Sequence, residues 1–159
     1  ELMTILSVFG HNDAIEWSLN FAEADAPLPS WINGSSAYSL WWMLCQRDFY
    51  LYRGNLDDLK MRQSYMKELL KQVCSHVDNK GQGHLDGFRF LDWPTFEMTD
   101  VIASGMRSLC YMALNAGAEM ERVLGDDDMV TMCRQAAERL RKRTLPNYGN
   151  KEAAALRII

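Results

Sequence analysis

The apolar residues of this chain recur at spacings of three and four along almost its whole length, and this periodicity restricts the fold more than any other feature. Such spacing gathers the apolar side chains on one face of an α-helix, and no segment shows the apolar–polar alternation of a half-buried strand. We therefore expect an all-α protein. The predicted helices span about residues 2–9, 13–24, 36–52, 55–77, 96–124, 126–145 and 151–159.

Glycine and proline residues mark the connections between these helices. Pro27 and Pro29 fix φ and restrict the residue before each of them, which predicts an extended loop. Gly54 is expected to end the third helix, and Asn55 is expected to cap the fourth. A glycine-rich turn opens an irregular connection over residues 79–94. Short and long connections thus alternate, and the resulting helical hairpins must stack or close into a ring to bury their apolar faces.

The composition is that of a globular domain and argues against a nucleic-acid surface. Of the 159 residues, 48% are hydrophobic and 24% are charged, which argues against disorder. The net charge is −4 and no basic block interleaves with aromatic residues, so a nucleic-acid surface is not expected. The densest basic stretch, residues 139–143, falls at a helix end, where cations offset the helix dipole. No apolar run approaches the roughly 18 residues of a membrane span.

The cysteine, histidine and acidic residues do not form a recognisable metal, redox or nucleophilic site. The cysteines are Cys45, Cys74, Cys110 and Cys133, and the histidines are His11, His76 and His84. None of the cysteines has the two-residue spacing of a metal or redox motif, so we interpret all four as small buried hydrophobes without disulfides. The histidines are expected to form hydrogen bonds at helix ends and in loops. Glu68, Glu119 and Glu138 are expected to be solvated. No metal or cofactor is expected.

The second and third predicted helices carry many aromatic side chains. In the second, Ile15 and Leu19 mark the buried face, and Trp17 is assigned to packing near that face. In the third, adjacent residues point about 100° apart, so at most one of Trp41 and Trp42 faces a pocket and most of the aromatic residues are core. A proline-flanked loop precedes this helix, and its Trp31 is the aromatic residue most expected there to contact a ligand.

The long connection around residues 83–94 combines aromatic and acidic side chains, and loops on a rigid scaffold are where binding groups concentrate. Asp92 and Trp93, before Pro94, suit a carbohydrate: an indole covers the apolar face of a pyranose, and a carboxylate accepts hydrogen bonds from its hydroxyls. On these residues alone a structural interpretation is favoured instead. In that interpretation Trp93 anchors the loop and Asp92 caps the following helix.

A family pattern occurs in this connection at Leu85-Asp86-Gly87-Phe88-Arg89-Phe90-Leu91-Asp92-Trp93-Pro94. This run resembles the Asp-Trp loop of bacterial α-L-rhamnosidase-like glycoside hydrolases, which have a six-hairpin, (α/α)6-barrel fold. Residues 1–10 look like the helix that follows the Gly-Asp-x-His-Pro-Glu segment of these enzymes. Residues 31–54 and 151–156 also fit the pattern, so the resemblance covers essentially the whole chain.

The resemblance implies that residues 1–159 are one partial domain, an arc of about three antiparallel hairpins from an inverting glycosidase. The general acid of the family corresponds to a segment before Glu1 and the general base to one beyond Ile159, so the chain alone is expected to be inactive. Trp93 would line a rhamnose pocket, supported by Asp92. Arg47 replaces a tryptophan found in many members, which leaves the sugar preference open.

The partners implied are a rhamnosylated glycan or glycoside, the rest of the barrel, and a second copy of the segment. Self-association is expected because a barrel cut into an arc leaves apolar helix faces without neighbours. A periplasmic or secreted parent fits the resemblance. Two alternatives stay open: a free-standing helical-repeat domain that holds a glycan or protein without catalysis, and a parent that has lost its catalytic carboxylates.

Overall fold

A computed structural model describes residues 2–10, 12–143, 146 and 148–157 of the chain. About 74% of the chain is helical, and within the described ranges there is no β-strand, so the all-α prediction is confirmed. The helices are α1 (Leu2–Phe9), α2 (Asp13–Asp25), α3 (Ser36–Arg53), α4 (Leu56–Ser75), α5 (Thr99–Leu124), α6 (Asp127–Lys142) and α7 (Lys151–Ala155), with the 3-10 helices η1 (Ile32–Gly34) and η2 (Trp93–Thr95). One antiparallel bridge joins Val77 to Gly83.

Several helix ends lie where local signals predict them. Gly54 adopts the left-handed conformation, with φ of 67°, and its N–H donates to the carbonyl of Tyr50. The Asn55 side chain then accepts hydrogen bonds from the first turn of α4, which satisfies amides that have no helical partner. Gly125 ends α5 with φ of 83°, and the Asp126 carboxylate caps α6. These residues make the short connections between α3 and α4 and between α5 and α6.

Other helix ends differ from the prediction by two or three residues. The helix α4 ends at Ser75, and α5 begins at Thr99 because η2 and a turn at residues 96–97 come before it. The helix α6 ends at Lys142, whereas Leu145, the predicted end, lies outside the described residues. The basic residues of the last turn of α6 lie at its negative end, as expected from the helix dipole.

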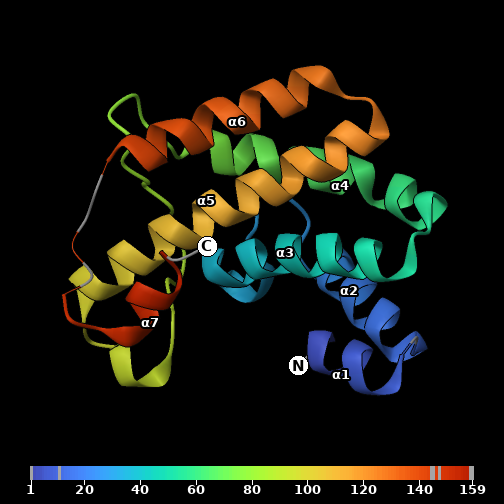
Figure 1. Cartoon of the computed structure of the whole chain (residues 1–159), viewed down its shortest axis with the longest axis horizontal. Coiled ribbons are helices and arrows are strands. Elements are labelled where there is room, and N and C mark those ends of the chain that lie inside the picture. The colour runs from blue at the N-terminus through green and yellow to red at the C-terminus, as the bar shows by residue number, and fades with distance from the viewer. Residues whose placement is uncertain (1, 11, 144–145, 147, 158–159) are drawn as a thin grey trace.

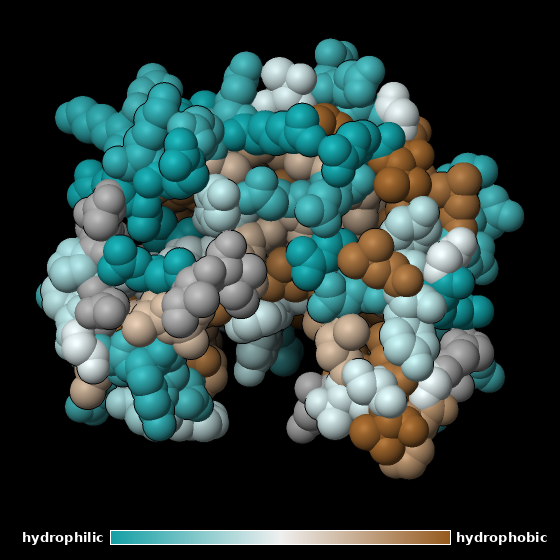
Figure 2. All heavy atoms as spheres, viewed as in Figure 1, coloured by the Kyte–Doolittle hydropathy of each residue, from teal (hydrophilic) through white to brown (hydrophobic). Residues whose placement is uncertain are grey.

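The helices form successive hairpins in which alternate helices are neighbours (Figure 1). The helix α1 packs against α3, α3 against α5 and α5 against α7, while α4 packs against α6. In Figure 1, α3 and α5 run in one direction and α4 and α6 return in the other. The buried face of α5 includes Leu109, Leu114 and Met120, so this helix forms the centre of the core. The space-filling view shows a hollow between the parts that contain α7 and α1 (Figure 2).

The long connections gather at one end of this arrangement. The connection between α4 and α5, the end of α6 and the start of α7 lie with the start of α3 at the left of Figure 1. The short connections after α3 and α5 lie at the opposite end. We call the first of these the long-loop end. It contains the connection with the Asp-Trp pair, and it is therefore the end at which a ligand site is sought.

The prediction for Trp17 is wrong, because this side chain is 77% exposed. Ile15 and Leu19 are buried as predicted. Trp17 and Phe21, one turn apart, form a second apolar stripe on a different side of α2, and both are exposed. The prediction for the adjacent tryptophans is confirmed: Trp42 is buried and donates from Nε1 to the carbonyl of Leu19 at 3.0 Å, whereas Trp41 is 41% exposed.

Candidate functional site

The connection between α4 and α5 is fastened to the connection between α2 and α3. The N–H of Phe88 donates to the carbonyl of Gly34 at 2.8 Å, and the Ser35 hydroxyl donates to the carbonyl of Phe88 at 2.8 Å. Gly87 has φ of +70°, and a Cβ at this position would lie 2.7 Å from Cδ1 of Trp31. The glycine therefore provides both a left-handed turn and room for the Trp31 indole.

Trp31 contributes to this fastening from inside the molecule. Its side chain is buried, its Nε1 donates to Oδ1 of Asp86 at 2.6 Å, and its ring meets the His76 ring edge-on with centroids 5.6 Å apart. The His76 Nε2 atom lies 3.4 Å from the same Asp86 oxygen. In this structure Trp31 thus positions the loop. Its contact with a ligand stays a prediction.

Trp93 lies on the outside of the same connection, where its side chain is 76% exposed. Four rings pack on one another here, and we call them the aromatic cluster: Phe88, Phe90, Trp93 and Phe96. The Trp93 ring meets Phe90 edge-on at 5.1 Å between centroids and is tilted against Phe96 at 6.3 Å. The indole is therefore supported by neighbouring rings and still open to a ligand, and its ring contacts are also compatible with a loop anchor.

Asp92 caps the short helix η2. Its Oδ1 atom accepts from the N–H of Trp93 at 2.8 Å, and its carbonyl accepts from the N–H and the hydroxyl of Thr95. This capping is the structural role considered for Asp92. It uses one carboxylate oxygen, and Oδ2 has no hydrogen bond within the described residues. Since a carboxylate offers about four acceptor positions, capping leaves Asp92 able to accept from a ligand hydroxyl.

His76 and His84 have the hydrogen-bonding roles expected of them, and three of the cysteines are buried as expected, whereas Cys45 is half-buried. His76 lies at the end of α4, with Nδ1 2.8 Å from the carbonyl of Gln72, and His84 Nε2 lies 3.0 Å from Oδ2 of Asp78. This contact with His84, together with backbone hydrogen bonds, lowers the pKa of Asp78 to about 2. His11 lies outside the described residues. All four cysteines are free, and no cluster of potential metal ligands occurs in the described part of the chain.

Two buried charged residues were not anticipated from the sequence. Arg62 is 3% exposed and donates from Nη2 to Oδ1 of Asn20 at 2.7 Å. Glu121 is fully buried and accepts from the Gln63 amide at 2.9 Å, and burial raises its pKa. The burial of Arg62 could have been inferred from the sequence, because this residue falls on the apolar stripe of α4 between Leu59 and Met66. Both residues join helices together and lie apart from the aromatic cluster.

Comparison with protein-family models, curated proteins and solved structures finds no match to this chain. The resemblance to α-L-rhamnosidase-like enzymes therefore rests on the residues quoted above. No helix in the described ranges is long and apolar enough to span a membrane.

Proposed function

We propose that this chain forms part of the sugar-binding wall of an α-L-rhamnosidase-like glycoside hydrolase. The observation that carries the proposal is the exposed Trp93 indole, supported by the aromatic cluster and next to Asp92. A deoxysugar such as rhamnose presents C–H groups and a methyl group that pack on an aromatic face. The hydroxyls of the same sugar need acceptors, and Oδ2 of Asp92 is one such acceptor.

The rigidity of the loop supports the proposal further. Hydrogen bonds at Gly34 and Ser35 fasten the connection on one side of the cluster, and the Asp92 cap with Pro94 restrains the other side. A side chain held in place before binding loses less conformational entropy when the sugar arrives. The cluster is therefore suited to bind a small ligand that has both an apolar face and hydroxyl groups.

The order of helix packing supports a place in a six-hairpin barrel. In such a barrel alternate helices form an inner ring, and here α1, α3, α5 and α7 follow one another as neighbours. The hollow between α1 and α7 is the position at which further hairpins would close the ring. In this proposal the general acid comes from a segment before Glu1 and the general base from a segment after Ile159. Both of these residues lie outside the described ranges.

The proposal is tested by measuring the affinity of the chain for L-rhamnose and for an aryl α-L-rhamnoside by calorimetry. Trp93→Ala is compared with Trp17→Ala, because the two side chains are 76% and 77% exposed and lie at different places on the molecule. Loss of a stacking surface should weaken binding roughly 5- to 150-fold, by analogy with aromatic stacking on bases. We expect this loss for Trp93→Ala and unchanged affinity for Trp17→Ala. Equal affinity of both variants would contradict the proposal.

We also propose that the chain alone does not hydrolyse the aryl rhamnoside. General acid and general base catalysis each contribute roughly 10²- to 10⁴-fold, and the proposal assigns both groups to other segments. Release of the aryl group is the measurement. Turnover that a single substitution within residues 2–157 abolishes would place the catalytic carboxylates inside the chain and contradict this assignment.

A second candidate is a non-catalytic helical domain that binds a protein or glycan. The observation in its favour is the apolar surface beyond Trp93: Phe88, Phe96 and Met98 are each about half exposed. Exposed aromatic and methionine side chains are common at protein interfaces. The sugar titration separates the first candidate from a domain that binds only protein, because such a domain gives no heat with L-rhamnose or its aryl glycoside.

A further inference from the structure

Two thiols meet in the core where α4 packs against α6. Near the start of α6, Nζ of Lys67 on α4 lies 2.5 Å from Oδ2 of Asp126, which caps α6. From this contact the two helices run in the same direction (Figure 1). Seven residues further along each helix, close to two full turns, come Cys74 and Cys133. The two cysteines therefore lie at the same height, on the sides by which the helices face each other.

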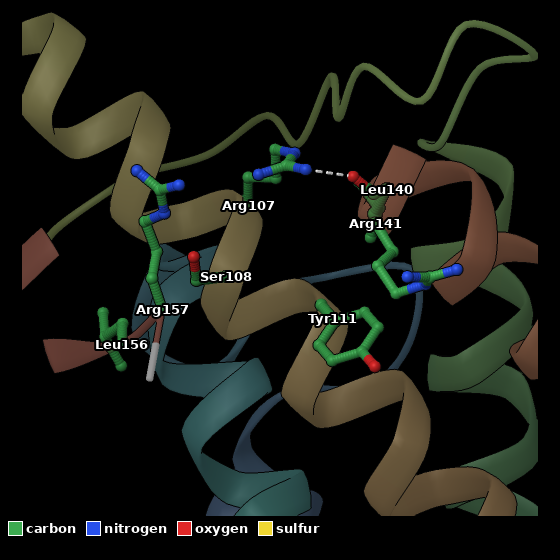
Figure 3. A pocket seen from close by; sticks show the side chains of 7 residues that line it. All are labelled: Arg107, Ser108, Tyr111, Leu140, Arg141, Leu156 and Arg157. Carbon is green, nitrogen blue, oxygen red and sulfur yellow. Dashed lines mark hydrogen bonds between the residues drawn. The ribbon is translucent and has the colours of Figure 1, made fainter. Parts of the chain in front are cut away.

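The far end of α6 is held in place as well. Arg107 of α5 donates a hydrogen bond to the carbonyl of Leu140, beside the pocket that Figure 3 shows. Nη2 of Arg139 donates to the carbonyl of Val77, just after α4, at 3.5 Å. Because contacts near both of its ends fix α6 against its neighbours, the cysteine that it carries is held beside the cysteine of α4.

The two thiols differ in exposure and in acidity. Cys74 is 8% exposed, whereas Cys133 is fully buried. A hydrogen bond from the Cys133 thiol lowers the pKa of Cys74; burial opposes this shift, and the positive charge of Arg139 adds to it. The same hydrogen bond and burial raise the pKa of Cys133. Since the thiolate is the reactive form of cysteine, Cys74 is the nucleophile of the pair.

We propose that Cys74 and Cys133 form an oxidative modification site, at which a hydroperoxide converts the two thiols into a disulfide between α4 and α6. First, the Cys74 sulfur attacks an oxygen of the hydroperoxide and the O–O bond breaks. The leaving oxygen takes up the thiol proton, which gives a sulfenic acid at Cys74 and an alcohol, or water where the oxidant is hydrogen peroxide. The Cys133 sulfur then attacks the Cys74 sulfur, the S–O bond breaks, and water leaves with the proton of Cys133.

Overall, two thiols are oxidised and one hydroperoxide is reduced. Hydrogen peroxide is close to water in size, so the small exposed part of Cys74 is enough for it to reach the sulfur. The site is independent of the aromatic cluster and of the function proposed for it.

The other two cysteines provide internal controls. Cys45 on α3 is half-buried, and burial, followed by the charge of Asp48, raises its pKa. Cys110 is buried on α5, and burial raises its pKa as well. Cys45 is thus more exposed than Cys74 but less acidic. If exposure alone decided the reaction, Cys45 would be oxidised before Cys74.

The first test treats the folded chain with hydrogen peroxide, alkylates the remaining thiols in denaturant and maps the tryptic peptides by mass spectrometry. Trypsin places Cys74 in residues 72–80 and Cys133 in residues 123–134. We expect these two peptides to be linked, the link to disappear with dithiothreitol, and Cys45 and Cys110 to be alkylated. Oxidation of Cys45 ahead of Cys74, links scattered among all four cysteines, or no link at millimolar peroxide would overturn the proposal.

The second test removes one thiol at a time. Cys133→Ala should give no linked peptide, and its Cys74 should instead stop at a sulfenic acid that dimedone traps. Cys45→Ala is the matched control, and it should form the link at the rate of the unsubstituted chain. Loss of the link in Cys45→Ala, or no trapped sulfenic acid in Cys133→Ala, would contradict the proposal. If Cys133→Ala fails to fold, the peptide map of the unsubstituted chain and the melting temperature decide.

The melting temperature shows whether the disulfide fits the folded chain. It is measured for the peroxide-treated chain before and after dithiothreitol, which reduces a disulfide but leaves oxidised methionine unchanged. A disulfide that closes a loop of this length should raise the melting temperature by roughly 5–15 °C. An equal or lower melting temperature before reduction would mean that the link forms only in unfolded chains, and the proposal would then be wrong.

Discussion

At the scale of single residues, Tyr65 links three parts of the core. Its hydroxyl donates to the carbonyl of Ala26 at 3.0 Å, and its ring meets Trp42 edge-on at 5.2 Å between centroids. Burial, and to a lesser extent the charge of Glu23, raises the pKa of Tyr65 to about 12. The folded chain therefore favours the neutral phenol, whose proton makes the hydrogen bond.

This shift predicts a loss of stability at high pH. The folded-state pKa of Tyr65 lies above its unfolded value of about 10, so its contribution is fully present below pH 10 and is lost as the pH rises through about 12. The measurement is the free energy of unfolding in urea across this window. We expect a shallower decline in Tyr65→Phe than in the parent chain. Parallel curves would show that Tyr65 does not hold its proton on folding.

The residues of the candidate site were predictable to different degrees. The residues around Trp93 favour a loop anchor, and only the family resemblance predicts a side chain that lines a pocket; the structure leaves it 76% exposed. The burial of Trp31 could not be predicted from the sequence, because it depends on Asp86, a hydrogen-bond partner 55 residues away. Trp17 was misassigned for a related reason: helical periodicity identifies apolar stripes, but only the neighbouring helices decide which stripe is covered.

At the scale of elements, local chemistry set most helix ends. Asn55 and Asp126 cap helices, and Gly54 and Gly125 end them, through contacts within a few residues. Such contacts can be inferred from sequence because they need no tertiary structure. The start of α5 could not be inferred from the sequence, since it depends on how η2 folds within the long connection.

Two left-handed glycines provide a test of packing between elements. Gly81 and Gly125 have φ of +71° and +83°, but a Cβ at Gly81 would lie 2.0 Å from the carbonyl oxygen of Arg139, whereas a Cβ at Gly125 would meet open space. Gly125→Ala should cost about 1–2 kcal/mol from backbone strain alone. Gly81→Ala should cost about 1–3 kcal/mol more, because the turn must move away from α6. Urea unfolding measures both, and equal losses would contradict this close approach.

At the scale of the whole molecule, the chain exposes a large apolar surface on its first two helices. Phe9, Trp17 and Phe21 are each at least 70% exposed, and Figure 2 shows apolar surface over α1. Exposed apolar patches of this kind commonly mark interaction surfaces. In the proposed barrel this region would meet further helices, which is a feature that no local sequence signal reveals.

We predict that the isolated chain self-associates through this surface. Sedimentation velocity over a range of concentrations should show oligomers for the unsubstituted chain and a shift toward monomer for a variant carrying Trp17→Ser and Phe21→Ser. A matched double variant at Met61 and Leu51, which are also exposed, should leave the association unchanged. A parent chain that stays monomeric at every concentration, with α1 well protected from hydrogen exchange, would contradict the prediction.

The central claim is that the aromatic cluster at the long-loop end binds sugar, and an NMR titration of the labelled chain with L-rhamnose tests it most directly. The indole N–H signals of Trp93 and Trp17 report on two equally exposed tryptophans in one experiment. We predict that the Trp93 signal and the backbone signals of Phe88 to Phe96 shift with a common saturation curve while the Trp17 signal does not move. A titration that leaves the Trp93 signal in place, or that shifts Trp17 to the same extent, would contradict the account.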